Sequence, residues 1–262
     1  MSWFPTVDPL FMVSGFFVGL LVGQTGVGGG SLMTPILVLL FGISPTTAVG
    51  TDLLYASATK SVGTLVHGLN RTVDWRIVGR LASGSVPGTL ITLLTLSHSN
   101  IAGSGGQRII SLLLGIMLLL TSVSLVFRVR FLRLMRPVLD GVTLRQAERL
   151  TVVTGVTLGV LVTLSSVGAG ALGVTALLLL YPHRPMAVIV GSDIAHAVPL
   201  TLVAGVGHAW LGSVDWGLLT SLLSGSIPGV ILGSYLSARI PDAVLRPILA
   251  AVLCVVGARL VF

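Results

Sequence analysis

The sequence predicts an all-α polytopic membrane protein with two inverted repeats, each a glycine-broken helix hairpin followed by three transmembrane helices. Composition, apolar stretches and recurring motifs support this fold. Only 9% of the 262 residues are charged and 53% are hydrophobic, whereas a soluble domain carries about 25% charged residues. Mean hydropathy is +1.03. Water could not wet a surface so poor in charge, so lipid must surround most of the chain.

Eight apolar stretches run along the chain and predict its membrane helices. They cover residues 10–41, 46–69, 74–96, 106–127, 148–180, 187–211, 215–237 and 243–261. An arginine-rich segment divides them four and four, which gives a first repeat at 1–127, a linker at 128–147 and a second repeat at 148–262. Basic loops stay on the cytoplasmic side of a membrane, so we expect the linker there.

Motifs of the first half recur in the second half at one spacing. Gly50-Thr51-Asp52 returns as Gly191-Ser192-Asp193, which is 141 residues later. The same spacing relates His67 to His208, Val73-Asp74-Trp75 to Val214-Asp215-Trp216, and the Gly84–Gly88 segment to the Gly225–Gly229 segment. Four spaced motifs in one register indicate an internal duplication.

The charges of equivalent loops indicate that the repeats are inverted. The turn at Val73 carries Arg71, Arg76 and Arg80, whereas its counterpart at 210–217 has no basic residue. Two further loop pairs switch sides in the same way, which is typical of inverted repeats. Inversion requires an odd number of crossings in each half. A parallel arrangement with eight full crossings is the alternative.

Stretches 10–41 and 148–180 must then cross the membrane an even number of times. Each is too short for two full spans of about 20 residues. We expect each to break at its glycine run into two short helices that form a hairpin. Both termini then lie outside the cell.

These elements also carry a family resemblance. The glycine run from Gly26 to Gly30, the Val-Asp-Trp-Arg motif and the Gly-Ser-Val-Pro-Gly motif, with their degenerate second copies, resemble the sulfite exporter TauE/SafE family over nearly the whole chain. The resemblance implies a membrane transporter of small anions, including sulfite and sulfonates, that works in the direction of export. The motifs are much less specific about the substrate.

The two glycine breaks are the predicted substrate site. Non-helical backbone survives at membrane depth only where protein buries it or where it lines a polar cavity. The helix that restarts after each break presents free N–H groups, which favour an anion. The predicted ligands are Gln24, Thr25, Gly28, Gly29, Gly30 and Ser31 in the first break and Ser165, Ser166, Gly168 and Gly170 in the second. The glycine rows at Gly15–Gly23 and Gly225–Gly233 are instead expected to pack helices closely.

Ionisable residues inside apolar stretches extend this prediction. Lys60, the only lysine, shares one face of the 46–69 helix with Asp52. Such groups are costly in a membrane unless paired or hydrated, so Lys60 either attracts the anion or forms a structural ion pair. Asp52, Tyr55, Asp193 and His196 are candidates for coupling or gating. For His196, a buried neutral histidine is the alternative to proton transfer. His67 and His208, near span ends, are expected at the membrane interface.

We therefore expect a secondary transporter of small oxyanions, sulfite or an organosulfonate such as sulfoacetate, in the cell inner membrane. Protons are a hypothetical coupling ion, and an anion channel with the same helix ends is the alternative function. No nucleotide-binding, hydrolase or metal-ligand motif occurs, so we expect no enzyme activity, no cofactor and no metal. A basic tract interleaved with aromatic residues is also missing, which argues against nucleic acid. The sequence leaves open whether the chain forms a homodimer.

Overall fold

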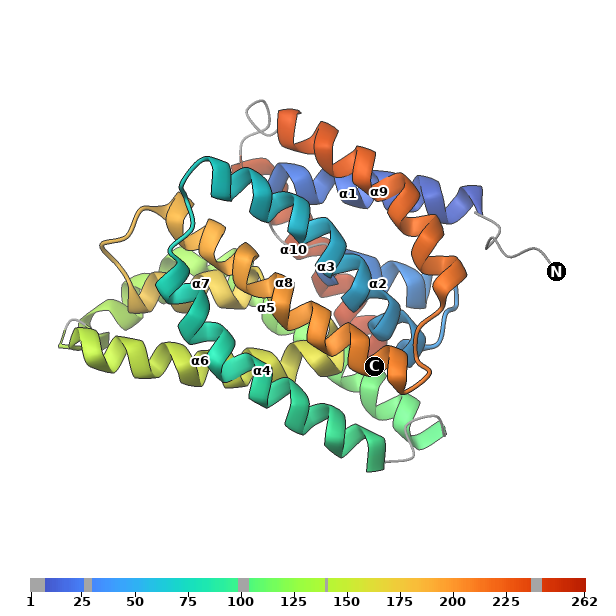
Figure 1. Cartoon of the computed structure of the whole chain (residues 1–262), viewed down its shortest axis with the longest axis horizontal. Coiled ribbons are helices and arrows are strands. Elements are labelled where there is room, and N and C mark those ends of the chain that lie inside the picture. The colour runs from blue at the N-terminus through green and yellow to red at the C-terminus, as the bar shows by residue number, and fades with distance from the viewer. Residues whose placement is uncertain (1–7, 26–29, 99–103, 140, 237–241) are drawn as a thin grey trace.

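The computed structural model describes residues 8–25, 30–98, 104–139, 141–236 and 242–262. In these ranges every regular element is an α-helix, as predicted (Figure 1). The ten helices are α1 (Pro9–Thr25), α2 (Gly30–Leu39), α3 (Pro45–Leu69), α4 (Trp75–His98), α5 (Ser104–Leu139), α6 (Leu144–Ser165), α7 (Ala171–Leu180), α8 (Met186–Trp210), α9 (Trp216–Leu236) and α10 (Asp242–Val261).

Within the described ranges, five helices are long and apolar enough to cross a membrane by length and composition. They are α4, α5, α6, α8 and α9. The chain is thus built as a polytopic membrane protein. Helix α3 is 25 residues long, but it carries Asp52 and Lys60 and buries both side chains inside the molecule. Burial within the helix bundle is what allows two ionisable groups on one apolar helix.

The second glycine run interrupts the helical chain where the sequence predicts a break, because α6 ends at Ser165 and α7 begins at Ala171. In the first half α1 ends at Thr25 and α2 begins at Gly30, and the predicted break between them falls on residues 26–29, outside the described residues. α7 then runs back along α6, because the Tyr181 hydroxyl lies 2.8 Å from the Thr151 hydroxyl near the start of α6. The second half therefore contains the expected hairpin.

The hairpin arms are not both short, and this corrects the prediction. α7 has 10 residues, but α6 has 22 and is long enough by itself to cross a membrane. The added length lies at its N-terminus, where Thr143 caps the helix and Gln146 returns a bond to the Thr143 backbone. This reciprocal pair starts the helix inside the segment that composition assigned to the linker. α5 likewise continues through the arginines to Leu139.

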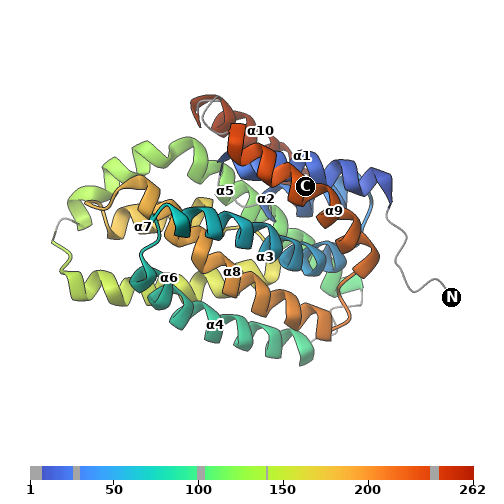
Figure 2. The same ribbon diagram turned by 45° about the horizontal axis from the view of Figure 1, so that its top comes forward.

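Two parallel helix pairs form the flanks of the molecule, α1 with α9 and α4 with α6 (Figures 1 and 2). Glycines let the backbones touch in both pairs. A Cβ added to Gly229 would lie 2.3 Å from the Phe16 carbonyl oxygen, and one on Gly15 would lie 2.3 Å from that of Leu222. On the other flank, a Cβ on Gly84 would lie 2.0 Å from the Val152 oxygen. The predicted packing role is confirmed for Gly15, Gly19, Gly225, Gly229 and Gly233.

Helices α3 and α8 cross antiparallel through the middle of the molecule. Gly50, near the start of α3, packs against Ser213, which follows the end of α8. Gly205, near the end of α8, packs against Leu54. α5 and α10 also run antiparallel, with the Ser122 hydroxyl donating to the Ala250 carbonyl at 2.7 Å and Gly115 facing Gly257. Among the described residues, the buried ionisable side chains Asp52 and Lys60 lie on α3, and Asp193, His196 and His208 lie on α8.

Candidate functional site

The second helix break has a backbone that requires its glycines. Gly168 and Gly170 have φ values of 115° and 121°, which side chains with a Cβ rarely adopt. Ser166 is left-handed too, with φ 56°, and its hydroxyl is buried without a hydrogen-bond partner in the described structure. The Ser165 hydroxyl instead donates to the Leu161 carbonyl at 2.7 Å and accepts from the Val167 N–H. Of the two predicted serines, Ser166 is therefore the one with a free hydroxyl.

The first break lies largely outside the described residues. Gly28 and Gly29 are not described, and nothing is stated of the side chains of Gln24, Thr25 and Ser31 at the adjoining helix ends. Gly30 is the first residue of α2. The predicted roles of all six residues stay predictions.

Two fully buried carboxylates lie against the N-terminal halves of the short helices α2 and α7. The Thr34 hydroxyl on α2 donates to Asp52 Oδ2, and Asp52 also lies beside Ser166 of the second break, outside hydrogen-bond geometry. Asp193 lies against the first turn of α7, where a Cβ on Gly173 would be only 2.0 Å from Asp193 Oδ1. Asp52 Oδ1 and both Asp193 oxygens have no hydrogen-bond partner among the described groups.

Lys60 reaches from α3 into the second break. Its ammonium donates to the Ala169 carbonyl at 3.3 Å, its side chain is 5% exposed, and it interacts electrostatically with both Asp193 and Asp52. Within the described ranges the ion pairs closer than 4.0 Å are Arg80–Glu148 and Arg184–Asp74, and both lie outside this centre. Lys60 therefore interacts with two carboxylates without an ion-pair contact closer than 4.0 Å among the described residues, and both its predicted anion-binding role and the alternative of a structural ion pair stay predictions.

An imidazole and a phenol complete the buried centre at equivalent positions. His196 Nε2 lies 2.8 Å from the Ser85 hydroxyl on α4. Tyr55, 141 residues earlier, lies beside Ser226 on α9 without reaching hydrogen-bond geometry. Both serines belong to the repeated Gly-Ser-Val/Ile-Pro-Gly motif, from which the sequence predicted an internal duplication and a family resemblance but no place in the site. The shared spacing was the signal that could have paired them with His196 and Tyr55.

The interfacial prediction for His208 is wrong. His208 is 2% exposed, and its Nε2 lies 2.9 Å from the Thr163 carbonyl near the end of α6. The end of α8 is covered by α6 of the same repeat and by the start of α3, where Gly50 contacts the His208 Cβ. His67 is half-buried and bonds the Thr72 hydroxyl at 2.8 Å.

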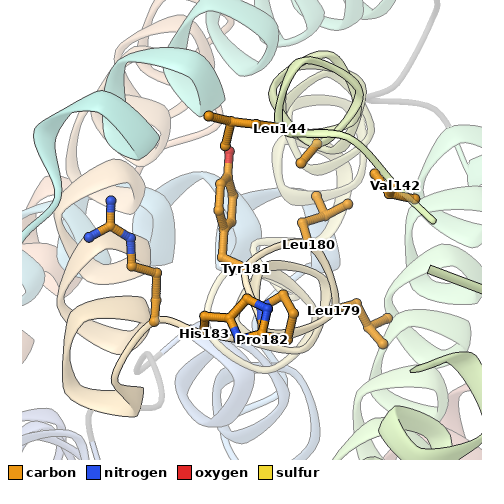
Figure 3. Close-up of a pocket in the computed structure, with 9 residues that line it drawn as sticks. Val142, Leu144, Leu179, Leu180, Tyr181, Pro182 and His183 are labelled. Carbon is orange, nitrogen blue, oxygen red and sulfur yellow. The ribbon is translucent and has the colours of Figure 1, made fainter. Parts of the chain in front are cut away.

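An open cavity of about 320 Å³ lies away from the charged centre. It sits between the start of α6 and the α7–α8 connection (Figure 3) and is lined by Val142, Leu144, Ala147, Leu179, Leu180, Tyr181, Pro182, His183 and Arg184. None of these residues was predicted to bind substrate. By contrast, the charged and imidazole side chains of the centre are nearly or fully buried.

The described residues contain no group of three or more His, Cys, Asp or Glu side chains placed to hold a metal ion. What they bring together is one cation, two carboxylates, an imidazole and a free hydroxyl around a helix break. This set suits recognition of a small anion and transfer of protons.

Comparisons with known proteins agree with this architecture. The family model for "Sulfite exporter TauE/SafE" matches residues 11–260. The chain is 40% identical to "Probable membrane transporter protein YjnA" of Bacillus subtilis over 251 residues, which is 95% of this chain and 98% of that protein. It is 28% identical to "Probable membrane transporter protein YdhB" of the same species over 221 residues, 82% of this chain and 84% of the relative.

No solved structure matches the chain. The family match and these relatives support a membrane transporter. Because the family model covers almost the whole sequence, the chain belongs to the sulfite exporter TauE/SafE family.

Proposed function

We propose that the protein is a secondary transporter of small oxyanions, with sulfite or an organosulfonate such as sulfoacetate as substrate. The observation that carries the proposal is the position of Lys60. This only lysine of the chain is buried and reaches the break that precedes α7, where Ser166 holds a buried hydroxyl without a partner. A cation, a hydroxyl donor and the start of a helix meet at one place, which favours an oxyanion.

We further propose that the two repeats are inverted. Equivalent helices are antiparallel where they meet, α3 with α8 and α5 with α10. A two-fold axis that relates antiparallel helices is perpendicular to them, so it lies in the plane of a membrane that they cross. Equivalent connections also lie at opposite ends of the molecule: α3–α4 and α7–α8 at one end, α8–α9 and α2–α3 at the other (Figures 1 and 2).

This arrangement suggests an orientation in the cell inner membrane. The end with the α3–α4 and α5–α6 connections carries Arg71, Arg76, Arg130, Arg133 and Arg145, among others. Basic residues favour the cytoplasmic side, so the central linker is assigned there. Both termini would lie outside.

Coupling is assigned to the buried carboxylates and their neighbours. Asp52, Asp193 and His196 can each bind and release a proton, and Tyr55 stands at the position equivalent to His196. A proton gradient could then drive anion movement as access to the buried centre alternates between the two sides. Family membership suggests export as the direction.

An anion channel is the second candidate, because it could use the same helix end and lysine. Proteoliposomes distinguish the two: a transporter gives saturable counterflow that a proton gradient stimulates, whereas a channel gives a current that rises linearly with voltage.

The proposal is tested by anion binding to the purified protein. Sulfite, sulfoacetate, taurine and sulfate are titrated against wild type, Lys60→Ala, Ser166→Ala and the control Ser61→Ala, whose hydroxyl bonds the Ser57 carbonyl on the same helix as Lys60. We expect Lys60→Ala to weaken binding of the preferred anion at least tenfold and Ser166→Ala about threefold to tenfold, the range for one lost hydrogen bond. Unchanged affinity in both variants would refute the proposed site.

A further inference from the structure

The anion-favouring end of α7 is already occupied by an acidic side chain. Asp193 is fully buried, and its Oδ1 lies where a Cβ on Gly173 would stand, in the first turn of a 10-residue helix. The Gly170 backbone at the N-cap is close to the same carboxylate. The free N–H groups and positive dipole end of a helix attract any nearby anion, so Asp193 lies where a substrate anion would be best stabilised.

The charges around Asp193 leave little room for a second anion. Lys60 on α3 is the cation that faces it, and Asp52, also on α3, is the other acid that interacts with this lysine. α7 carries no acidic or basic residue, and His196, one turn along α8, is held by Ser85 of α4. With both carboxylates ionised and Lys60 charged, the centre carries one net negative charge. A bound monoanion would raise this to two in a site without bulk water, where like charges repel strongly.

We propose that Asp193 is a tethered competitor of the substrate: its carboxylate occupies the α7 end in the empty protein and gives way when an anion binds there. This inference rests on the proposed anion-transport function and adds how that site is regulated. The carboxylate gives way by accepting one proton from solvent on a carboxylate oxygen, so the anion and the proton arrive together and the net charge of the centre is unchanged. Anion binding is then coupled to proton binding by charge balance in one small volume.

The weak hydrogen bonding of Asp193 favours such an exchange. Asp52 accepts a hydrogen bond from the Thr34 hydroxyl, whereas among the described residues Asp193 has no side-chain donor and lies only near the Gly170 backbone. A carboxylate with fewer hydrogen bonds loses fewer interactions on protonation than one held by a hydroxyl. Of the two acids, Asp193 is therefore the one assigned to exchange.

The test compares wild type with Asp193→Asn, which keeps the shape of the side chain and removes its charge. Binding of sulfoacetate and methanesulfonate to the purified full chain is measured between pH 6 and pH 8.5. Proton uptake is followed with methanesulfonate, which does not titrate in this range, in weakly buffered solution. Asp193→Ser serves as a second neutral variant if Asp193→Asn does not fold. The control is Asp215→Asn, where the carboxylate caps α9 through the Leu218 N–H and asparagine is an equally good cap.

Wild type should bind more weakly as pH rises and take up close to one proton for each anion. Asp193→Asn should bind at least tenfold more tightly than wild type at pH 8.5, with little pH dependence and little proton uptake. Asp215→Asn should behave as wild type.

If wild type binds an anion and Asp193→Asn keeps the same affinity and proton uptake, this inference is overturned while the proposed function stands. The same conclusion follows if Asp52→Asn, and not Asp193→Asn, removes the proton uptake. If neither wild type nor Asp193→Asn binds any anion tested, the proposed function fails together with the inference.

Discussion

Ser166 holds a backbone conformation that glycine adopts with less strain. Its φ of 56° places it in the left-handed region at the end of α6, where helices commonly use glycine. A residue with a Cβ loses about 1–2 kcal/mol there. Its hydroxyl is buried beside the charged centre and has no partner in the described structure. We infer that serine at this position supplies a hydroxyl to the centre and lowers the stability of the fold.

Ser166→Gly should separate stability from binding. Glycine relieves the left-handed strain but also increases the entropy of the unfolded chain, so the stability of the variant should equal or exceed that of wild type by up to about 1 kcal/mol. Anion affinity should fall, because the hydroxyl is lost. Thermal unfolding and anion titration on the same preparation measure both effects. Wild-type affinity in a variant of wild-type stability would remove Ser166 from the site.

The sequence identified the ionisable members of the centre but not their partners. Asp52, Lys60, Asp193 and His196 are conspicuous because charged and imidazole groups are rare in apolar stretches. Ser85, Ser226 and Thr34 carry no such mark, since serine and threonine are ordinary in membrane helices. His208 was wrongly expected at the membrane interface because it lies close to the end of an apolar stretch, and this position was interpreted as exposure. Burial at that position comes from α6 and α3, which a one-dimensional pattern does not reveal.

At the scale of elements, the α4–α6 contact depends on glycines at which the two backbones meet. Gly84 of α4 contacts the Val152 backbone of α6, and Gly155 of α6 contacts the Leu81 backbone of α4. Each helix therefore has a glycine where the backbone of the other helix comes closest. Gly79 lies on α4 as well, but a Cβ added there would meet no atom within 4 Å. One helix thus carries a glycine required by packing and a glycine that packing does not require.

Gly84→Ala and Gly79→Ala should therefore change stability in opposite directions. A Cβ at Gly84 would lie 2.0 Å from a backbone oxygen, so the helices must separate, and the expected destabilisation is about 1–3 kcal/mol or more. At Gly79 alanine improves helix propensity by up to about 1 kcal/mol. Melting temperatures of the detergent-solubilised variants, followed by size-exclusion chromatography, measure the difference. Equal melting temperatures would show that α4 and α6 do not meet at these glycines.

Most helix positions were predictable, and the discrepancies have one cause. Predicted stretch 46–69 corresponds to α3 at Pro45–Leu69, and stretch 187–211 corresponds to α8 at Met186–Trp210. The misplaced boundaries are those of α5 and α6, because composition marks where lipid ends and not where the helix ends. Arginine has good helix propensity, and the Thr143–Gln146 capping box was a readable signal for the start of α6.

At the scale of the whole molecule, the two repeats are interlocked. α1 of the first repeat packs on α9 of the second, and α6 of the second packs on α4 of the first. Hydrogen bonds also link the connection before α4 to α8 and the connection before α9 to α3. The Asp74 N–H donates to the Ser192 hydroxyl at 2.8 Å, and the Asp215 N–H donates to the Thr51 hydroxyl at 3.0 Å. Internal repetition predicts which residues are equivalent. It does not predict which elements are in contact, and so this exchange of partners was not foreseen.

Inversion itself makes a sharp prediction about equivalent surface positions. Leu69 and Trp210 are 141 residues apart, end the two central helices α3 and α8, and are 84% and 93% exposed. Inverted repeats place them on opposite sides of the membrane, whereas parallel repeats place them on the same side. Single cysteines at the two positions can therefore decide between the models. The exposed native cysteine, Cys254, is first replaced by serine.

In Cys254→Ser cells, Trp210→Cys should react with a membrane-impermeant maleimide from outside. Leu69→Cys should react only in inside-out vesicles, because its turn carries the arginines that favour the cytoplasm. The Cys254→Ser protein without a new cysteine gives the background, and labelling after solubilisation shows that each cysteine is reactive. Labelling of both positions from the same side would exclude an axis in the membrane plane. The two repeats would then have the same orientation across the membrane. A single binding site between them could not change its access from one side to the other by exchanging the conformations of two equivalent halves.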